Sequence, residues 1–259
     1  MSNISFFFKD SKPFVKLMML IFIFMVLATI TGFISIFMPM SPLLLQAISQ
    51  IIMFGFSVIV WGLMFEDSAY KFISLEKKNL SYYFIIAVLM LIIATPFIDG
   101  LGLWNNNWHF EGEEVFRKME ETSEKIMEGF MSDTSALGLI INVLVVAALP
   151  AVLEEFFFRG AMQPTIINLV KNRFIGILIT SIIFSLIHFQ PFSSLPRVFL
   201  GLFLGYLYVF SKNIFVPILF HFLNNLTVVV NSYLINTHKT NINLNELGSV
   251  FNPYLFVLS

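Results

Sequence analysis

Long apolar runs separated by short polar stretches dominate the chain. A helix that crosses a membrane needs about 20 mainly apolar residues, and by that measure the pattern predicts seven spans. They cover about 14–38, 42–64, 81–101, 136–160, 174–190, 196–211 and 213–234. The sequence ends in "VFNPYLFVLS", which resembles the start of a further apolar segment. The pattern therefore predicts an all-α, polytopic transmembrane helix bundle of seven to eight spans.

One polar and acidic stretch interrupts the apolar runs. It reads "WNNNWHFEGEEVFRKMEETSEKIMEGFMSDTS". Four apolar residues in it recur at helical spacing on one face: Phe116, Met119, Ile126 and Phe130. Such a face is typical of a helix that rests on a membrane surface. We therefore predict an extra-membrane amphipathic helix near 111–130.

The composition supports a membrane protein and excludes several other classes of protein. The chain is 58% hydrophobic and 12% charged, which is more apolar surface than a soluble domain of this length can bury. The net charge of −1 and the lack of a basic block argue against a nucleic-acid partner. The absence of cysteine excludes disulfides and thiolate catalysis. The positions of Lys and Arg favour a cytoplasmic N-terminus, and the compact chain suggests a bacterial plasma membrane.

Three charged residues lie inside the fourth predicted span, in "LPAVLEEFFFRG". Glu155 and Arg159 are four residues apart, so they share a helical face and can neutralise each other. Glu154 points about 100° away and has no partner on its own helix. Each central charge costs about 2.5–3.5 kcal/mol on insertion scales. The pattern suggests a structural pair beside an available carboxylate, although an ion pair that only holds helices together would also fit.

Polar residues in later spans favour the chemical interpretation. The segment "IIFSLIHFQP" places Phe184 and His188 on one face, and "FHFLNN" does the same for His221 and Asn225. A single membrane histidine is usually a hydrogen-bond partner between helices. Two histidines on separate spans, beside an unpaired glutamate, are more typical of a functional site.

A hairpin between the fourth and fifth spans would bring two of these groups to one depth. Glu154 and His188 are equally far along the chain from Lys171, near which the hairpin would turn. Both then lie about 25 Å from the turn at the rise of an α-helix. This requires the fourth helix to continue past Pro164, where it could kink.

Taken in order, the three motifs resemble a known family. Glu154-Glu155-x-x-x-Arg159, Phe184-x-x-x-His188 and His221-x-x-x-Asn225 are similar to the CAAX protease and bacteriocin-processing (CPBP, Abi) family of intramembrane proteases. That family is related to the type II Ras-converting CAAX endopeptidase. The resemblance covers roughly 145–230, within a motif-bearing core of about 136–234 in a single integral-membrane domain, 1–259. It implies a catalytic cavity inside the bundle and hydrolysis of a peptide or protein substrate, which the family precedent allows to be membrane-anchored.

The resemblance also implies a role for each motif residue. Glu154 and His188 would activate water, and His221 and Asn225 would stabilise the oxyanion. The residues expected to support the site are Glu155, Arg159 and Phe184. Amide hydrolysis needs both functions, a base for the water and donors for the tetrahedral oxygen. Because the chain has no G-x-S-x-G motif and no cysteine, direct attack by water is expected.

Metal dependence is left open by the sequence. Glu154, His188 and His221 could bind zinc and leave a fourth position for water. No H-E-x-x-H motif supplies two ligands from one helix, and Asn225 is a better donor than ligand. We therefore expect that no cofactor is required, with zinc as the alternative.

Two other function classes compete with the protease. A non-catalytic bacteriocin-immunity or membrane assembly factor could use the same scaffold for binding. An ion-coupled transporter would also explain buried Glu and His, but it predicts repeat-related broken helices, and the sequence shows no such symmetry.

A pair of small residues predicts close helix packing. Gly201 and Gly205 in "GLFLG" have the small-x-x-x-small spacing that lets membrane helices approach each other. We expect this contact to form within the protein.

Overall fold

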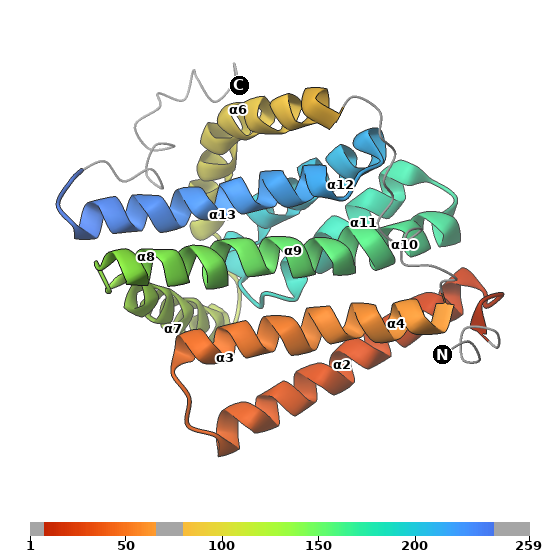
Figure 1. The fold of residues 1–259 in the computed structure, drawn as a ribbon, viewed down its shortest axis with the longest axis horizontal. Coiled ribbons are helices and arrows are strands. Elements are labelled where there is room, and N and C mark those ends of the chain that lie inside the picture. The colour runs from red at the N-terminus through yellow and green to blue at the C-terminus, as the bar shows by residue number, and fades with distance from the viewer. Residues whose placement is uncertain (1–7, 66–79, 241–259) are drawn as a thin grey trace.

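The computed structural model describes residues 8–65 and 80–240, and these residues form a bundle of packed helices (Figure 1). Six helical segments in the described ranges are long and apolar enough to cross a membrane. They are α2 (Pro13–Phe37), Pro42–Phe65, α6 (Leu80–Asn106), Ala136–Val170, Pro191–Ser211 and α13 (Phe215–Asn236). The predicted all-α polytopic membrane bundle is thereby confirmed.

Three of these segments are composite. Pro42–Phe65 consists of α3 (Pro42–Ser49), the π-helical η1 (Gln50–Phe56) and α4 (Ser57–Phe65). Ala136–Val170 consists of α8 (Ala136–Asn142), η2 (Val143–Ala148), α9 (Leu149–Glu155), η3 (Phe156–Met162) and α10 (Gln163–Val170). A short 3₁₀ turn, η4 (Pro191–Ser193), leads into α12 (Ser194–Ser211).

The predicted number of spans, seven to eight, is not confirmed. The predicted span 174–190 corresponds to α11 (Arg173–Leu186), which has 14 residues and is about 21 Å long. That is shorter than the hydrocarbon core of about 30 Å. The chain then leaves the helix in a turn, where Phe189 has a left-handed φ of 53°. The apolar C-terminal segment expected as an eighth span lies outside the described residues.

The Ala136–Val170 segment runs through the middle of the bundle. Figure 1 shows it lying between the α2/α4 pair and α13, and α9 packs against both η1 and α13. Pro150 and Pro164 each follow a π-helical segment, at the start of α9 and α10. Because a π-helical turn is wider, the Ala136–Val170 segment can accommodate the missing proline N–H and remain continuous. We refer to this segment as the central rod. The rod carries the charged motif of the fourth predicted span into the centre of the bundle.

The predicted hairpin is present between α10 and α11. Lys171 has a φ of 55°, and the Asn172 side chain caps α11 by accepting a hydrogen bond from the Ile175 N–H at 3.1 Å. A Cβ at Gly176 would lie only 2.4 Å from Cγ1 of Ile167, so this glycine lets the two helices touch. The hairpin turn near Lys171 is therefore confirmed.

The amphipathic helix is also confirmed, as α7 (Glu113–Met131). Glu120 and Met131 are buried against the rest of the protein, while Met119 and Ile126 on the predicted apolar face are exposed. The helix therefore contacts the bundle at Glu120, Phe130 and Met131, while Met119 and Ile126 of its apolar stripe remain exposed.

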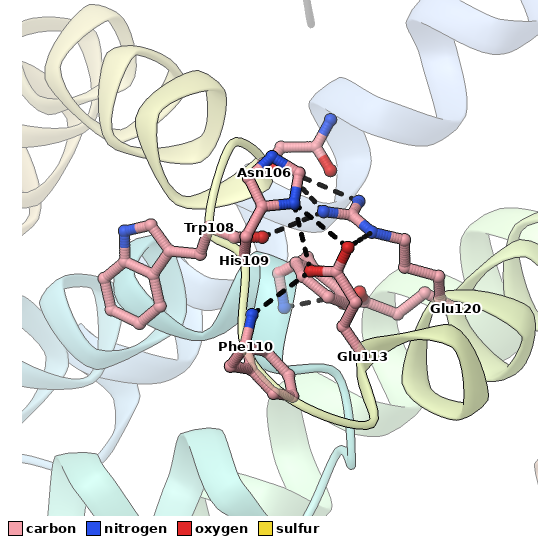
Figure 2. Close-up of polar contacts among 8 residues, drawn as sticks. Asn106, Trp108, His109, Phe110, Glu113 and Glu120 are labelled. Carbon is pink, nitrogen blue, oxygen red and sulfur yellow. Dashed lines mark hydrogen bonds and ion pairs between the residues drawn. The ribbon is translucent and has the colours of Figure 1, made fainter.

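A polar network fixes the start of α7 (Figure 2). The Glu113 carboxylate lies 3.0 Å from Nδ1 of His109 and accepts a hydrogen bond from the Phe110 N–H at 3.3 Å. Arg117 donates to the Trp108 carbonyl at 2.9 Å. The hydrogen bond with His109, followed by the contacts with Arg117, holds the pKa of Glu113 below its ordinary value.

Close glycine contacts join α12 to its neighbours, as the small-residue spacing predicts. A Cβ at Gly201 would lie 2.9 Å from Cβ of Ser181 on α11. A Cβ at Gly205 would lie 2.6 Å from Cγ2 of Ile177. The small-residue contact forms within the protein and brings the α12 backbone beside α11 and the central rod.

Candidate active site

Glu154 lies at the end of α9 and is buried. Its Oε1 accepts a hydrogen bond of 2.9 Å from Nε2 of Gln50, the first residue of η1. Gln50 is not among the predicted site residues, although a polar side chain inside an apolar run could have indicated it. Glu154 thus has a neutral partner from another segment and, as predicted, a different environment from its neighbour.

Glu155 is the centre of a fully buried ionic cluster. Its Oε1 is 2.9 Å from Nη1 of Arg159, which confirms the predicted pair, and 2.9 Å from Nδ1 of His221 on α13. Arg159 also donates through Nη2 to the Gly201 carbonyl at 3.0 Å. Oε2 of Glu155 and Nε of Arg159 are buried without a hydrogen-bond partner. The cluster ties the central rod to α12 and α13 around one carboxylate oxygen.

The Phe184 ring connects the two histidines. Its centroid lies 5.3 Å from that of His188 and 6.0 Å from that of His221. The guanidinium carbon of Arg159 lies 5.1 Å from the same ring, a cation–π distance. Phe184 therefore holds the two imidazoles apart while it packs against the ionic cluster.

His188 has a defined tautomer. Its Nδ1 lies 2.7 Å from the Phe184 carbonyl oxygen, which can only accept, so Nδ1 carries the hydrogen. In the neutral ring, Nε2 then carries a lone pair that is free to accept a proton. Glu154, Arg197 and His221 all act electrostatically on His188. The arrangement suits a general base.

Asn225 lies on α13 one helical turn after His221. It is half-buried on α13, and its Oδ1 accepts a hydrogen bond of 3.3 Å from Nδ2 of Asn224. Within the described part of the chain it makes no hydrogen bond to Glu154, His188 or His221. Since its oxygen is engaged, its NH₂ group is the end available to donate.

Two residues missed in the sequence hold the turn that carries His188. The first is Asn105, a buried residue near the end of α6. Its Nδ2 donates to the Pro191 carbonyl at 2.9 Å, and its Oδ1 accepts from the Leu195 N–H at 2.7 Å. This single amide bonds one backbone group in η4 and one in the first turn of α12.

The second is Glu120 on α7. Its carboxylate accepts hydrogen bonds from the Phe192 N–H at 3.3 Å and from the Ser193 hydroxyl at 3.1 Å. Arg117, one turn earlier, lies 3.9 Å from the Phe192 ring centre. Burial raises the pKa of Glu120, against the opposing effect of these hydrogen bonds. The extra-membrane helix is thus attached to the loop that follows His188.

The residues considered for zinc do not form a ligand set in this arrangement. Among the residues that the structure describes, no three His, Asp or Glu side chains are grouped so as to hold a metal ion. His221 contacts Glu155 rather than Glu154, and Glu154 binds an amide.

Comparison with known proteins agrees with the motif region. Residues 136–227 match the family described as type II CAAX prenyl endopeptidase, Rce1-like. A curated protein named membrane-embedded CAAX protease MroQ, from Staphylococcus aureus (strain USA300), is 33% identical over 96 residues. That match covers 35% of this chain and 38% of the relative, so it spans well under half of the relative's length. No solved structure matches. The resemblance indicated by the three motifs is confirmed.

Proposed function

We propose that this integral membrane protein, whose residues 136–227 match the Rce1-like CAAX endopeptidases, is an intramembrane endopeptidase that uses water as its nucleophile. One observation carries the proposal: two adjacent buried carboxylates have different partners. Glu155 is engaged by two cationic or ionisable groups, Arg159 and His221, and Glu154 by a neutral amide. The first is neutralised in place, which leaves the second as the group able to take a proton.

Glu154 and His188 are assigned to the activation of water. As water attacks the scissile carbonyl, its proton passes to the Glu154 carboxylate or to Nε2 of His188, and it is then delivered to the leaving amine. The Phe184 carbonyl supports this role because it fixes the ring with Nε2 unprotonated. A positioned base of this kind contributes about 10²–10⁴-fold to the rate.

His221 and Asn225 are assigned to the oxyanion. With Glu155 ionised, Nδ1 of His221 must donate to it, so Nε2 can donate only when the ring is an imidazolium. Asn225, one helical turn further along α13, would add the amide donor.

The proposed substrate is a peptide or protein, and a membrane-anchored one on the precedent of the prenyl endopeptidase family that residues 136–227 match. We place the protein in a bacterial plasma membrane with a cytoplasmic N-terminus. The competing function is a non-catalytic immunity or assembly factor. That alternative requires binding without hydrolysis, so a cleavage assay separates the two.

The test is cleavage by the purified protein in lipid nanodiscs. A proteome-derived peptide library is incubated with wild type and with His188→Gln, and new termini are identified by mass spectrometry. We expect new termini with wild type and at least about 100-fold fewer with the variant. Wild-type protein that is folded and generates no new termini would contradict the proposal and favour the binding factor.

The same assay tests the metal-free mechanism. Wild type is treated with a strong chelator, then dialysed and assayed again with and without added zinc. Activity that survives the chelator supports direct activation by Glu154 and His188. Activity that is lost and then restored by zinc would contradict it.

A further inference from the structure

A pocket of about 510 Å³ lies between α7 and the turn that follows α11. This volume falls within the range of about 300–1,000 Å³ that is usual for ligand sites. The residues that line it are Val115, Lys118, Met119, Thr122, Ser123, His188 and Phe189. The pocket therefore combines one face of the extra-membrane helix with one residue of the candidate active site.

His188 connects this pocket to the proposed chemistry. His188 borders the pocket, and its Nδ1 is held by the Phe184 carbonyl near the end of α11. Nε2, the atom assigned to proton transfer, is the ring nitrogen that remains free. A ligand in the pocket thus lies beside the residue that would act on it.

The walls of the pocket are apolar and accessible. Val115 is 64% exposed, Met119 44% and Phe189 66%. The hydroxyls of Thr122 and Ser123 are bonded to carbonyls of α7 itself. These two hydroxyls therefore need no hydrogen bond from a ligand, and burial of the exposed apolar side chains beneath a ligand is favourable.

Lys118 is the one charged side chain among the lining residues. Its ammonium group gives the pocket a positive character, whereas most other charged residues of α7 are glutamates. A ligand with a carboxylate near its apolar group fits this wall better than one with a cation.

The position of α7 relative to the opposite wall is supported by contacts with the segment that directly follows this wall. Glu120 binds the backbone and hydroxyl of the Phe192–Ser193 segment, and Arg117 stacks on the Phe192 ring. These contacts fix the distance between α7 and the His188 turn.

We propose that this pocket binds the polypeptide segment next to the scissile bond. An apolar side chain packs between Met119 and Phe189, and Lys118 favours a neighbouring carboxylate. The inference rests on the proposed function, since His188 is the group that acts on the bound segment. The polypeptide then reaches His188 from the side of α7.

A thiol reporter tests binding without relying on catalysis, because the natural chain contains no cysteine. Ser123→Cys places a thiol in the pocket, and Glu128→Cys places one at an exposed site of α7 that does not line it. Both variants are labelled with a maleimide in phosphatidylcholine nanodiscs. The probe is a decapeptide library with leucine fixed at one central position, compared with a matched library that has lysine there. Thr122→Cys replaces the first reporter if that variant does not fold.

We expect the leucine library to slow labelling of the Ser123→Cys thiol about tenfold at a concentration about ten times its dissociation constant. The lysine library should protect less, the Glu128→Cys thiol should be unaffected, and Met119→Glu should remove the protection. Equal protection by both libraries, or none, would overturn the inference. A thiol already protected in nanodiscs but reactive in detergent would overturn it in favour of lipid. Protection without any cleavage by wild type would leave a peptide-binding pocket and contradict the proposed hydrolysis alone.

Discussion

The two histidines of the candidate site occupy opposite surroundings. His221 lies in the middle of α13, is buried, and binds Glu155 together with Arg159. His188 lies in a turn beyond the end of α11, is half-buried, and borders an open pocket. The first is positioned by helices and charges, and the second by a loop held from α6 and α7.

This difference separates residues that maintain the fold from residues that face a substrate. Around His221, removal of one charge of the buried cluster leaves another charge without a partner. Around His188, the supporting contacts act on the turn, and their loss should alter catalysis together with stability. Variants in these two regions can therefore be compared directly.

The largest effect on stability is expected for Glu155→Gln. Arg159 would remain buried without its carboxylate, which costs about 3–5 kcal/mol of unfolding free energy. Thermal unfolding in detergent measures it. Glu154→Gln is the matched control, because the Glu154 carboxylate accepts a hydrogen bond from a neutral amide and, among the described residues, pairs with no buried cation. Equal unfolding temperatures for the two variants would remove the distinction between the two glutamates.

Asn105→Ala should have the next largest effect. The Leu195 N–H would lose its acceptor, and the Pro191 carbonyl would lose one donor while it keeps the Ser194 hydroxyl, at about 2–4 kcal/mol in total. Because the His188 turn would loosen, kcat should fall more than KM rises. Asn105→Asp keeps the acceptor for Leu195 and should recover part of both losses. A variant with lower stability but unchanged kcat would show that Asn105 does not position His188.

Gly201→Ala should destabilise the protein by about 1–3 kcal/mol through overpacking. The new Cβ would lie 2.9 Å from that of Ser181, and the shift would disturb the carbonyl that accepts from Arg159. Gly62→Ala is the control, because nothing lies within 4 Å of a Cβ there. If both variants unfold at the wild-type temperature, α11 and α12 are not in close contact.

The smallest effect is a pH dependence, about 1 kcal/mol or less, at Glu120. Burial raises the pKa of Glu120 above its ordinary value of 4.5, so its stabilising contribution is complete below pH 4.5 and is lost as pH rises through the raised pKa. The melting temperature of wild type relative to Glu120→Gln should therefore fall as pH increases. The pKa of Glu113 is lowered, so Glu113→Gln should show the opposite trend, with the wild-type advantage lost as pH falls. Identical pH profiles for wild type and Glu120→Gln would contradict this.

Hydropathy and helical spacing predicted much of the fold. Six of the seven spans predicted from length and apolarity correspond to long apolar helices, and the spacing of Glu155 and Arg159 identified their pair. The turn near Lys171 could be predicted because polar residues interrupt two apolar runs there. These features depend on neighbours in sequence, which is what a periodic pattern records.

The rest depends on contacts between distant parts of the chain. The apolar pattern continues through His188, so it did not reveal that α11 ends at Leu186. Gln50 reaches Glu154 from 104 residues away, and Glu120 reaches Phe192 from 72. No local pattern encodes such pairings.

The π-helical segments are a second reason why the contacts of the site could not be predicted from the sequence. They flank α9 and change the direction of side chains from the 100° step used in the sequence analysis. Wide turns of this kind recur at functional sites in other proteins.

The most direct measurement is the cleavage rate of Glu154→Gln per folded molecule, set beside its melting temperature. If this carboxylate activates water, the variant should have the same melting temperature as wild type and cleave at least about 10²-fold more slowly. A stable variant that cleaves at the wild-type rate would show that the proton of the attacking water goes elsewhere.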